Sequence, residues 1–96
     1  MKLPDLNLLV ALDILLEEGS AVAAARRMNL SAPAMSRTLA RIRDAIGDPV
    51  FVRSGRGLAT TPRALELREQ VRGVVEQAHA IFTSGREVDL RTLERT

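Results

Sequence analysis

The sequence predicts a mainly α-helical fold of four helices, with one two-stranded β hairpin before the last helix. Three observations carry this prediction: apolar residues recur at helical spacing, glycines and polar caps separate the helical segments, and a glycine-rich turn divides one short β-rich stretch. The chain has 96 residues, the size of one small domain. Because only Phe51 and Phe82 are aromatic, the core is expected to be aliphatic, and so small a core often needs a partner chain.

Two helices are expected over residues 5–18 and 21–28. Leucines recur at helical spacing in the first of them, at Leu6, Leu9, Leu12 and Leu16. Gly19 suits the C-cap of this helix, and Ser20 suits the N-cap of the next because its hydroxyl can accept from free backbone N–H groups. Asn29 predicts a tight turn, since asparagine tolerates the left-handed conformation.

A third helix is expected over residues 31–46. Ser31 is its N-cap, Pro33 fits the first turn, where a missing N–H costs nothing, and Gly47 ends the helix. One apolar stripe should face the core: Met35, Leu39, Ile42 and Ile46. The other face carries mostly small or polar side chains: Ala32, Pro33, Ser36, Arg37, Ala40, Arg43 and Asp44, with Arg41 on its flank.

A β hairpin is expected after the third helix. Its two β runs, residues 49–53 and 58–60, flank a turn at 54–57 whose glycines allow positive φ angles. Arg53 and Arg56 belong to this turn region, so the hairpin should present positive charge at its tip.

A long helix is expected from Thr61, its N-cap, and Pro62, its first position, to about Phe82. Its apolar residues follow a heptad spacing: Ala64, Leu67, Val71, Val74, Ala78 and Ile81. Three short helices cannot cover so long a seam. Part of it is therefore expected to pack on a second copy of the chain, as a homodimer through the 62–82 helix.

The net charge of +2 conceals an uneven distribution along the chain. Between Arg26 and Arg63 there are eight arginines and two acids, which leaves +6, whereas the rest of the chain carries −4. A basic middle segment between acidic ends predicts one positive face, whose commonest partner is phosphate. A solvated surface without a partner is the alternative reading of the charge alone.

The composition excludes several kinds of site. There is no cysteine and only one histidine, His79, so neither a thiolate nor a His-rich metal site is expected. No nucleophile with a base and no carboxylate pair stands out, so we expect neither an enzyme nor a cofactor. RNA or single-strand binding usually stacks bases on aromatic side chains, which this chain lacks. Without a membrane-length apolar run or a signal-peptide pattern, a soluble protein of a reducing compartment is expected.

The order of these elements predicts a winged helix-turn-helix followed by a long dimerisation helix. Two helices joined by a tight turn, the second presenting small and basic residues, match the helix-turn-helix, and the hairpin matches the wing. A major groove about 12 Å wide admits one helix, and small residues let its backbone approach the base edges. Residues 31–46 are thus expected in the major groove, and the wing, residues 50–60, at the minor groove or backbone.

The chain resembles the N-terminal domain of the LysR-type bacterial transcriptional regulators. The resemblance lies in Leu-Ser-Ala-Pro-Ala-Met-Ser-Arg at residues 30–37 and Gly-Asp-Pro-Val-Phe-Val-Arg at residues 47–53, followed by Gly55-Arg56-Gly57 and Thr61-Pro62. It implies that the recognition helix and the wing contact DNA, and the candidate DNA-binding residues are Ser31, Ala32, Pro33, Ser36, Arg37, Arg41, Arg53 and Arg56. One departure concerns Ala32, where the family usually has glutamine. Alanine cannot hydrogen-bond a base, although its methyl group can touch that of thymine.

The resemblance also implies a domain organisation. Residues 1–60 are expected to form the DNA-binding domain, residues 61–82 the dimerisation helix, and residues 83–96 a hinge toward an effector-binding domain that this chain lacks. A small-molecule effector is expected only for that absent domain. The chain is accordingly expected to be a fragment of a cytoplasmic bacterial regulator that associates with the nucleoid.

Two functions remain open at this point. The first is sequence-specific binding of duplex DNA by a dimer. The second is a protein-interaction module that uses the long helix, with DNA binding lost or incidental, which Ala32 and the missing effector domain would favour. Equal affinity for a promoter duplex and a random duplex would support the second function.

Overall fold

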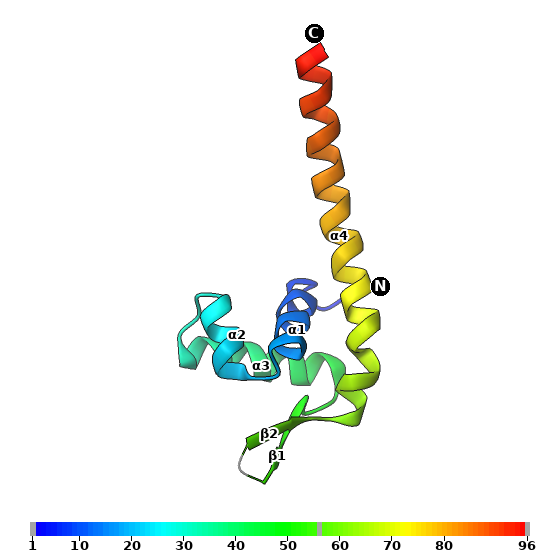
Figure 1. Cartoon of the computed structure of the whole chain (residues 1–96). Helices are drawn as coiled ribbons and strands as arrows, with labels where there is room; N and C mark the ends of the chain where they lie inside the picture. Colours follow the sequence, from blue (N-terminus) through cyan, green and yellow to red (C-terminus); the bar gives the residue numbers. More distant parts are fainter. Residues whose placement is uncertain (1, 56, 96) are drawn as a thin grey trace.

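The computed structural model describes residues 2–55 and 57–95, with side chains described as far as Thr83. The chain forms α1 (Asn7–Glu18), α2 (Ala21–Arg27), α3 (Ala32–Ile46), β1 (Phe51–Ser54), β2 (Gly57–Thr60) and α4 (Pro62–Arg95). The helices α1 to α3 and the hairpin form a head, and α4 passes beside α1 and projects far beyond it (Figure 1). The predicted winged helix-turn-helix is confirmed. Among the described residues, no helix is long and apolar enough to cross a membrane.

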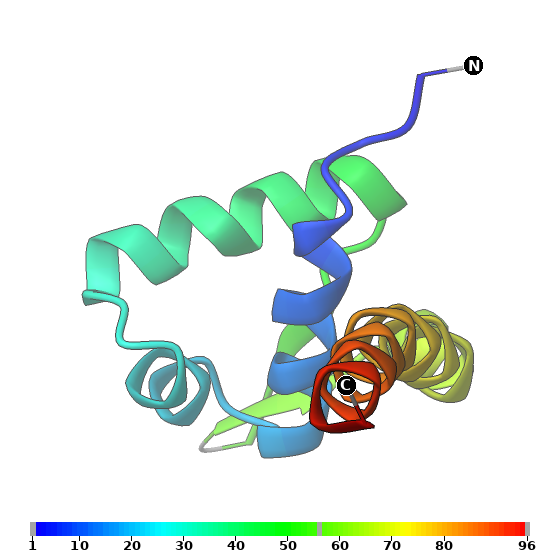
Figure 2. The same cartoon turned by 90° about the horizontal axis from the view of Figure 1, so that it is seen from above.

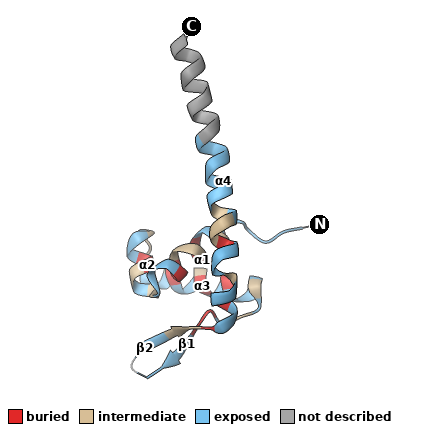
Figure 3. Ribbon diagram, turned by 45° about the vertical axis from the view of Figure 1, so that its right-hand side comes forward, coloured by how far each residue is buried: buried red, intermediate tan, exposed pale blue. Residues whose placement is uncertain are grey.

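The helix α1 is the centre of the core, because it contacts α2, α3 and α4. Figure 2 shows α3 running past the N-terminal end of α1, with α2 and α4 on opposite sides of α1. The largest fully buried side chains are Leu12 and Leu15 of α1, Ile42 of α3, and Val50 before the hairpin. Phe51 is buried, while Phe82 is 75% exposed, so the core is aliphatic with one aromatic ring. The buried residues gather in the head and the lower part of α4 (Figure 3).

Two helix boundaries differ from the predicted ones by more than one residue. The helix α1 begins at Asn7 instead of residue 5, because the Asp5 carboxylate accepts the Asn7 N–H at 2.9 Å and so lies outside the helix. The backbone of α4 stays helical to Arg95 instead of ending near Phe82. Residues 83–95 contain no proline, and the arginines, glutamates and leucines of 86–95 favour the helix, which offsets the poor propensity of Gly85. The role of this segment as a hinge stays a prediction.

The carboxylate of Asp48 joins three elements at the junction after α3. Its Oδ2 atom accepts the Val50 N–H at 2.7 Å and the Thr61 hydroxyl at 2.6 Å. The Thr61 Oγ1 atom in turn accepts the Ala64 N–H at 3.1 Å, which caps α4 as the sequence predicts. Arg43 donates to the Pro49 carbonyl oxygen at 2.7 Å and fixes the same loop. We call this set of hydrogen bonds the Asp48 junction.

Val50 adopts a backbone conformation that valine normally avoids. Its φ angle is +71°, in the left-handed region, which costs about 1–3 kcal/mol for a non-glycine residue. The cost is offset by the complete burial of its side chain and by hydrogen bonds at both backbone groups, since its carbonyl accepts the Thr61 N–H at 2.8 Å. The Asp48 junction therefore imposes the bend that sends the chain into the wing.

Ion pairs attach α4 to α1 beside the apolar contact. Arg72 donates to Asp13 at 2.8 Å and to Glu17 at 2.9 Å, and Arg27 of α2 lies 3.1 Å from the same Glu17 and 3.3 Å from Glu18. The hydrogen bond to Asp13 raises the pKa of Arg72, and that to Glu17 raises the pKa of Arg27, so both stay charged. This ion-pair cluster links α1 to α2 and α4, and because most of its side chains are exposed it adds only modestly to the apolar packing of α4 on α1.

We expect Asp48→Ala to lower the free energy of unfolding by about 1.5–3 kcal/mol, as hydrogen bonds to a charged group are lost and the Val50 N–H is left without its acceptor. Urea unfolding followed by circular dichroism measures this change. Asp44→Ala is the matched control, because Asp44 is exposed and makes no hydrogen bond to the described residues. Its effect should stay within about 0.5 kcal/mol. Equal unfolding midpoints for the two variants would contradict the role of the Asp48 junction.

Candidate nucleic-acid interface

The turn between α2 and α3 holds the two helices at a fixed angle. Asn29 has a φ angle of +55°, the left-handed conformation that the sequence predicts. The Leu30 N–H donates to the Ala25 carbonyl at 2.9 Å and closes the turn. Ala24 and Ala25 are buried, and their small side chains let the helices approach closely. The geometry of α3 is thus set by rigid local structure.

Both predicted serine caps are present. The Ser20 Oγ atom accepts the Ala23 N–H at 3.2 Å at the start of α2, and the Ser31 Oγ atom accepts the Ala34 N–H at 3.2 Å at the start of α3. Ser31 remains exposed, so its hydroxyl is accessible from solvent as well as being a cap.

The helix α3 separates its apolar and polar residues as predicted. Met35, Leu39 and Ile42 are buried, and Ile46 is half-buried. The candidate DNA-binding residues on this helix and its cap are all exposed: Ser31, Ala32, Pro33, Ser36, Arg37 and Arg41. Apart from the last, they cluster in the first two turns. Here the side chains are short, which leaves the helix backbone accessible to a large partner.

The hairpin that was predicted as a wing is an antiparallel pair with Arg53 opposite Leu58. Arg53 is exposed near the tip, and Gly55 takes the positive φ angle, +59°, that the turn requires. Arg56 lies outside the described residues. The wing extends from the head on the side away from the free end of α4 (Figure 1).

The arginines of the basic segment fall into two groups. The side chains of Arg26, Arg37 and Arg53 are exposed and form no ion pair or hydrogen bond with any described residue. Four others are engaged: Arg27, Arg41, Arg43 and Arg63. Arg41 lies 3.5 Å from Asp5, and since both side chains are exposed this pair is weak and leaves the arginine available. The first group supplies the positive charge that is free to bind an anion.

The heptad seam of α4 divides at Val71. Ala64 and Val71 are buried in the chain's own core, and Leu67 is half-buried against it. Beyond this point the seam residues Val74, Ala78 and Ile81 are exposed, whereas Val75, on the adjoining face of α4, still packs against the core. Phe82, which was not among the predicted interface residues, adds a large exposed ring next to Ile81. We call Val74, Ala78, Ile81 and Phe82 the α4 apolar strip.

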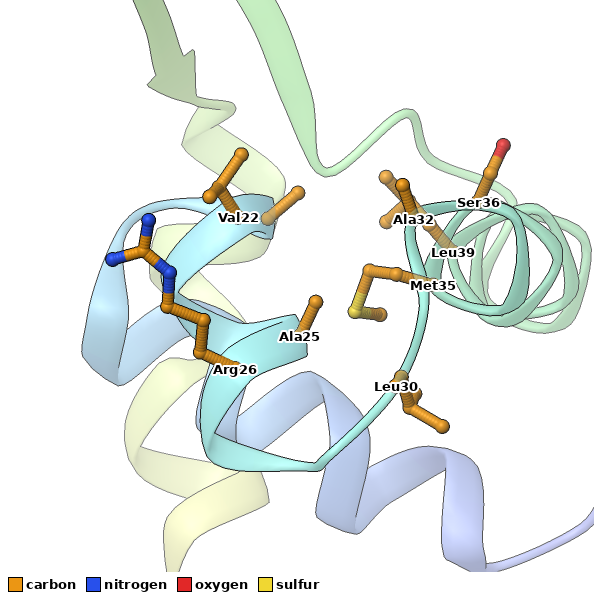
Figure 4. Close-up of a pocket in the computed structure, with 9 residues that line it drawn as sticks. Val22, Ala25, Arg26, Leu30, Ala32, Met35, Ser36 and Leu39 are labelled. Carbon is orange, nitrogen blue, oxygen red and sulfur yellow. The ribbon is translucent and has the colours of Figure 1, made fainter.

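An apolar groove lies between α2 and α3, next to the exposed face of α3 (Figure 4). Its volume is about 380 Å³. Val22 of α2 and Ala32 of α3 stand on its two sides, and Ser36 and Arg26 belong to its lining. The sequence analysis missed Val22, although its position two residues after the Ser20 cap places it at the exposed start of α2.

The described residues contain no cluster of three or more histidine, cysteine or acidic side chains that would hold a metal ion. His79 is exposed on α4, and its Nδ1 atom lies 3.3 Å from the Thr83 hydroxyl.

Comparisons with known proteins agree on one family. A family model described as "Bacterial regulatory helix-turn-helix protein, lysR family" matches residues 6–65. Among curated proteins, Nodulation protein D 2 of Sinorhizobium fredii (strain NBRC 101917 / NGR234) is 56% identical over 68 residues, and Nodulation protein D 1 of Rhizobium meliloti (strain 1021) is 57% identical over 68 residues. Each alignment covers 71% of this chain and 22% of the relative, so the chain spans about a fifth of their length.

Solved structures share the fold. A probable transcriptional regulator, PA0477 from Pseudomonas aeruginosa, matches with a TM-score of 0.71 and 33% identity over 78% of this chain and 25% of that chain. Vibrio fischeri DarR in complex with DNA gives a TM-score of 0.76 at 22% identity, covering 93% of this chain and 30% of the other. The BenM_DBD/benA site 1 DNA complex gives 0.74 at 19% identity, covering 88% and 94%.

Proposed function

Because the chain belongs to the LysR family of bacterial regulatory helix-turn-helix proteins, we propose that it binds double-stranded DNA sequence-specifically, as the DNA-binding domain of a dimeric transcription regulator. The observation that carries this proposal is the exposed face of α3, where short side chains surround the unpaired Arg37 and the wing adds Arg53. Two structural neighbours, DarR and BenM_DBD, were solved with DNA, which supports the same partner for this chain.

The recognition helix α3 reads bases in the major groove. Ser31, Ala32, Pro33 and Ser36 are short enough for the helix to lie close to the base edges, while Arg37 reaches guanine O6 and N7 or a phosphate. The wing, with Arg53 and Arg56, contacts the minor groove or the flanking backbone. Arg41 exchanges its weak pair with Asp5 for a phosphate.

The α4 apolar strip forms the dimer interface together with Leu67. Ala64 and Val71 belong to the same heptad seam but are occupied by the chain's own core, so they support the interface from inside. A two-fold dimer presents two recognition helices, whose half-sites should lie about one helical turn or a multiple apart.

The proposal extends to the rest of the protein. Members of this family are transcription regulators and not an enzyme class, so the function is binding without catalysis. Curated relatives are several times longer, and a small-molecule effector would act on a domain beyond this chain. Its place of action is the bacterial cytoplasm, where the nucleoid lies.

We expect Arg37→Ala to weaken binding to a selected duplex by about 1–3 kcal/mol and to relax base preference at one position. Fluorescence anisotropy with duplexes selected from a random pool measures both effects. Arg68→Ala, which removes the same charge from the exposed surface of α4, is the matched control and should change neither. If Arg37→Ala leaves both the affinity and the base preference unchanged, the proposal that α3 lies in the major groove is wrong.

The salt dependence and the choice of duplex test DNA binding as a whole. Affinity should fall steeply with salt, since each phosphate contact releases counterions. If the unaltered protein binds selected and random duplexes equally, the alternative function, a protein-interaction module that uses α4, is favoured instead.

We expect Val74→Asp to weaken the dimer at least about tenfold, because a carboxylate in the seam would lose its water without gaining a partner. Sedimentation velocity over a concentration series gives the dissociation constant. Ala80→Asp, on an exposed part of α4 outside the seam, is the control and should leave the dimer intact. A dimer that survives Val74→Asp would place the interface elsewhere, for example on α1.

A further inference from the structure

The groove between α2 and α3 has an apolar floor and an open side. Met35 and Ala25 are buried at 3% and 8% exposure and form the floor. Val22 and Ala32 face each other across the groove (Figure 4). Val22 is 65% exposed, so most of its side chain is open to a partner from outside the domain.

The groove is continuous with the proposed DNA-binding surface. Ala32 and Ser36 belong both to the groove lining and to the exposed face of α3. Arg26, also in the lining, is free of ion pairs with the described residues and supplies the positive charge that a phosphate beside the groove requires. A duplex held by α3 would therefore cover this groove and remove Val22 from water.

The apolar walls of the groove favour an apolar group of the DNA bases over a polar one. Its side walls, Val22 and Ala32, carry no hydrogen-bonding side chain, so they cannot satisfy the amino, carbonyl or ring-nitrogen groups that bases present. In the major groove, thymine is the base that carries an apolar group, the C5-methyl. The groove is larger than a single methyl group, so the methyl group would enter it together with the apolar edge of the adjoining deoxyribose.

We propose that the groove binds the C5-methyl group of a thymine next to the base pairs read by α3, and that Val22 is a specificity-determining residue. The inference rests on the proposed function and deepens it. Val22 and Ala32 enclose the methyl group from the two helices, while Arg26 contacts the neighbouring phosphate. The short side chain of Ala32 keeps the groove open, because a long polar side chain at this position would fill it.

The test replaces each thymine of a selected duplex in turn by deoxyuridine, which lacks only the methyl group. We expect one position in each half-site where the replacement weakens binding about fourfold, the loss that corresponds to one buried methyl group. Val22→Thr replaces a methyl group by a hydroxyl of similar size and should abolish this difference between thymine and uracil. Since Val22 is exposed, the variant should keep the unfolding temperature of the unaltered protein.

Val10→Thr is the matched control. Val10 is also an exposed helical valine, 42% exposed, but it lies on α1 outside the groove. This variant should retain the fourfold preference for thymine.

Two results would overturn the inference. A selected duplex that tolerates deoxyuridine at every position overturns it, while the proposed function stands as long as selected duplexes are still preferred over random ones. A fourfold effect that persists in Val22→Thr assigns the methyl contact to other residues.

Discussion

The hydrogen bonds of one carboxylate organise the second half of this chain. Asp48 accepts from Val50 and Thr61 and thereby controls both the bend into the wing and the first turn of α4. Without these hydrogen bonds, the left-handed conformation of Val50 would relax. The start of the wing would then no longer be tied to the first turn of α4. The helix α3 ends two residues before Asp48, so the positions of the wing and of α4 relative to α3 depend on this residue.

The core and the ion-pair cluster connect α1 to the other helices. The helix α1 packs against three other helices with aliphatic side chains, and its outer acidic residues bind arginines of α2 and α4. The arginines at the surface therefore fall into those that pair with acids and those that do not. Acids engage the arginines that hold the helices together, while Arg26, Arg37 and Arg53 remain free of such pairs among the described residues.

Most of the head could be predicted from the sequence because its signals are local. The caps at Ser20 and Ser31, the turn at Asn29 and the stripe of α3 each depend on residues a few positions apart. The contact between Arg72 and Asp13 joins residues 59 positions apart, and no local pattern indicates which acid an arginine selects. The heptad seam likewise shows which residues of α4 are apolar, but where the cover of α1 ends is a property of the assembled fold.

The length of α4 gives the molecule a mechanical property. The helix has 34 residues, and the core contacts and ion pairs with α1 that the structure describes lie in its first half. Over its length of about 50 Å, a rotation of about 5° at the anchored end would displace the far end by about 4 Å. Anything attached to that end thus senses small reorientations of the head in magnified form, and forces applied there return to the head with the same leverage.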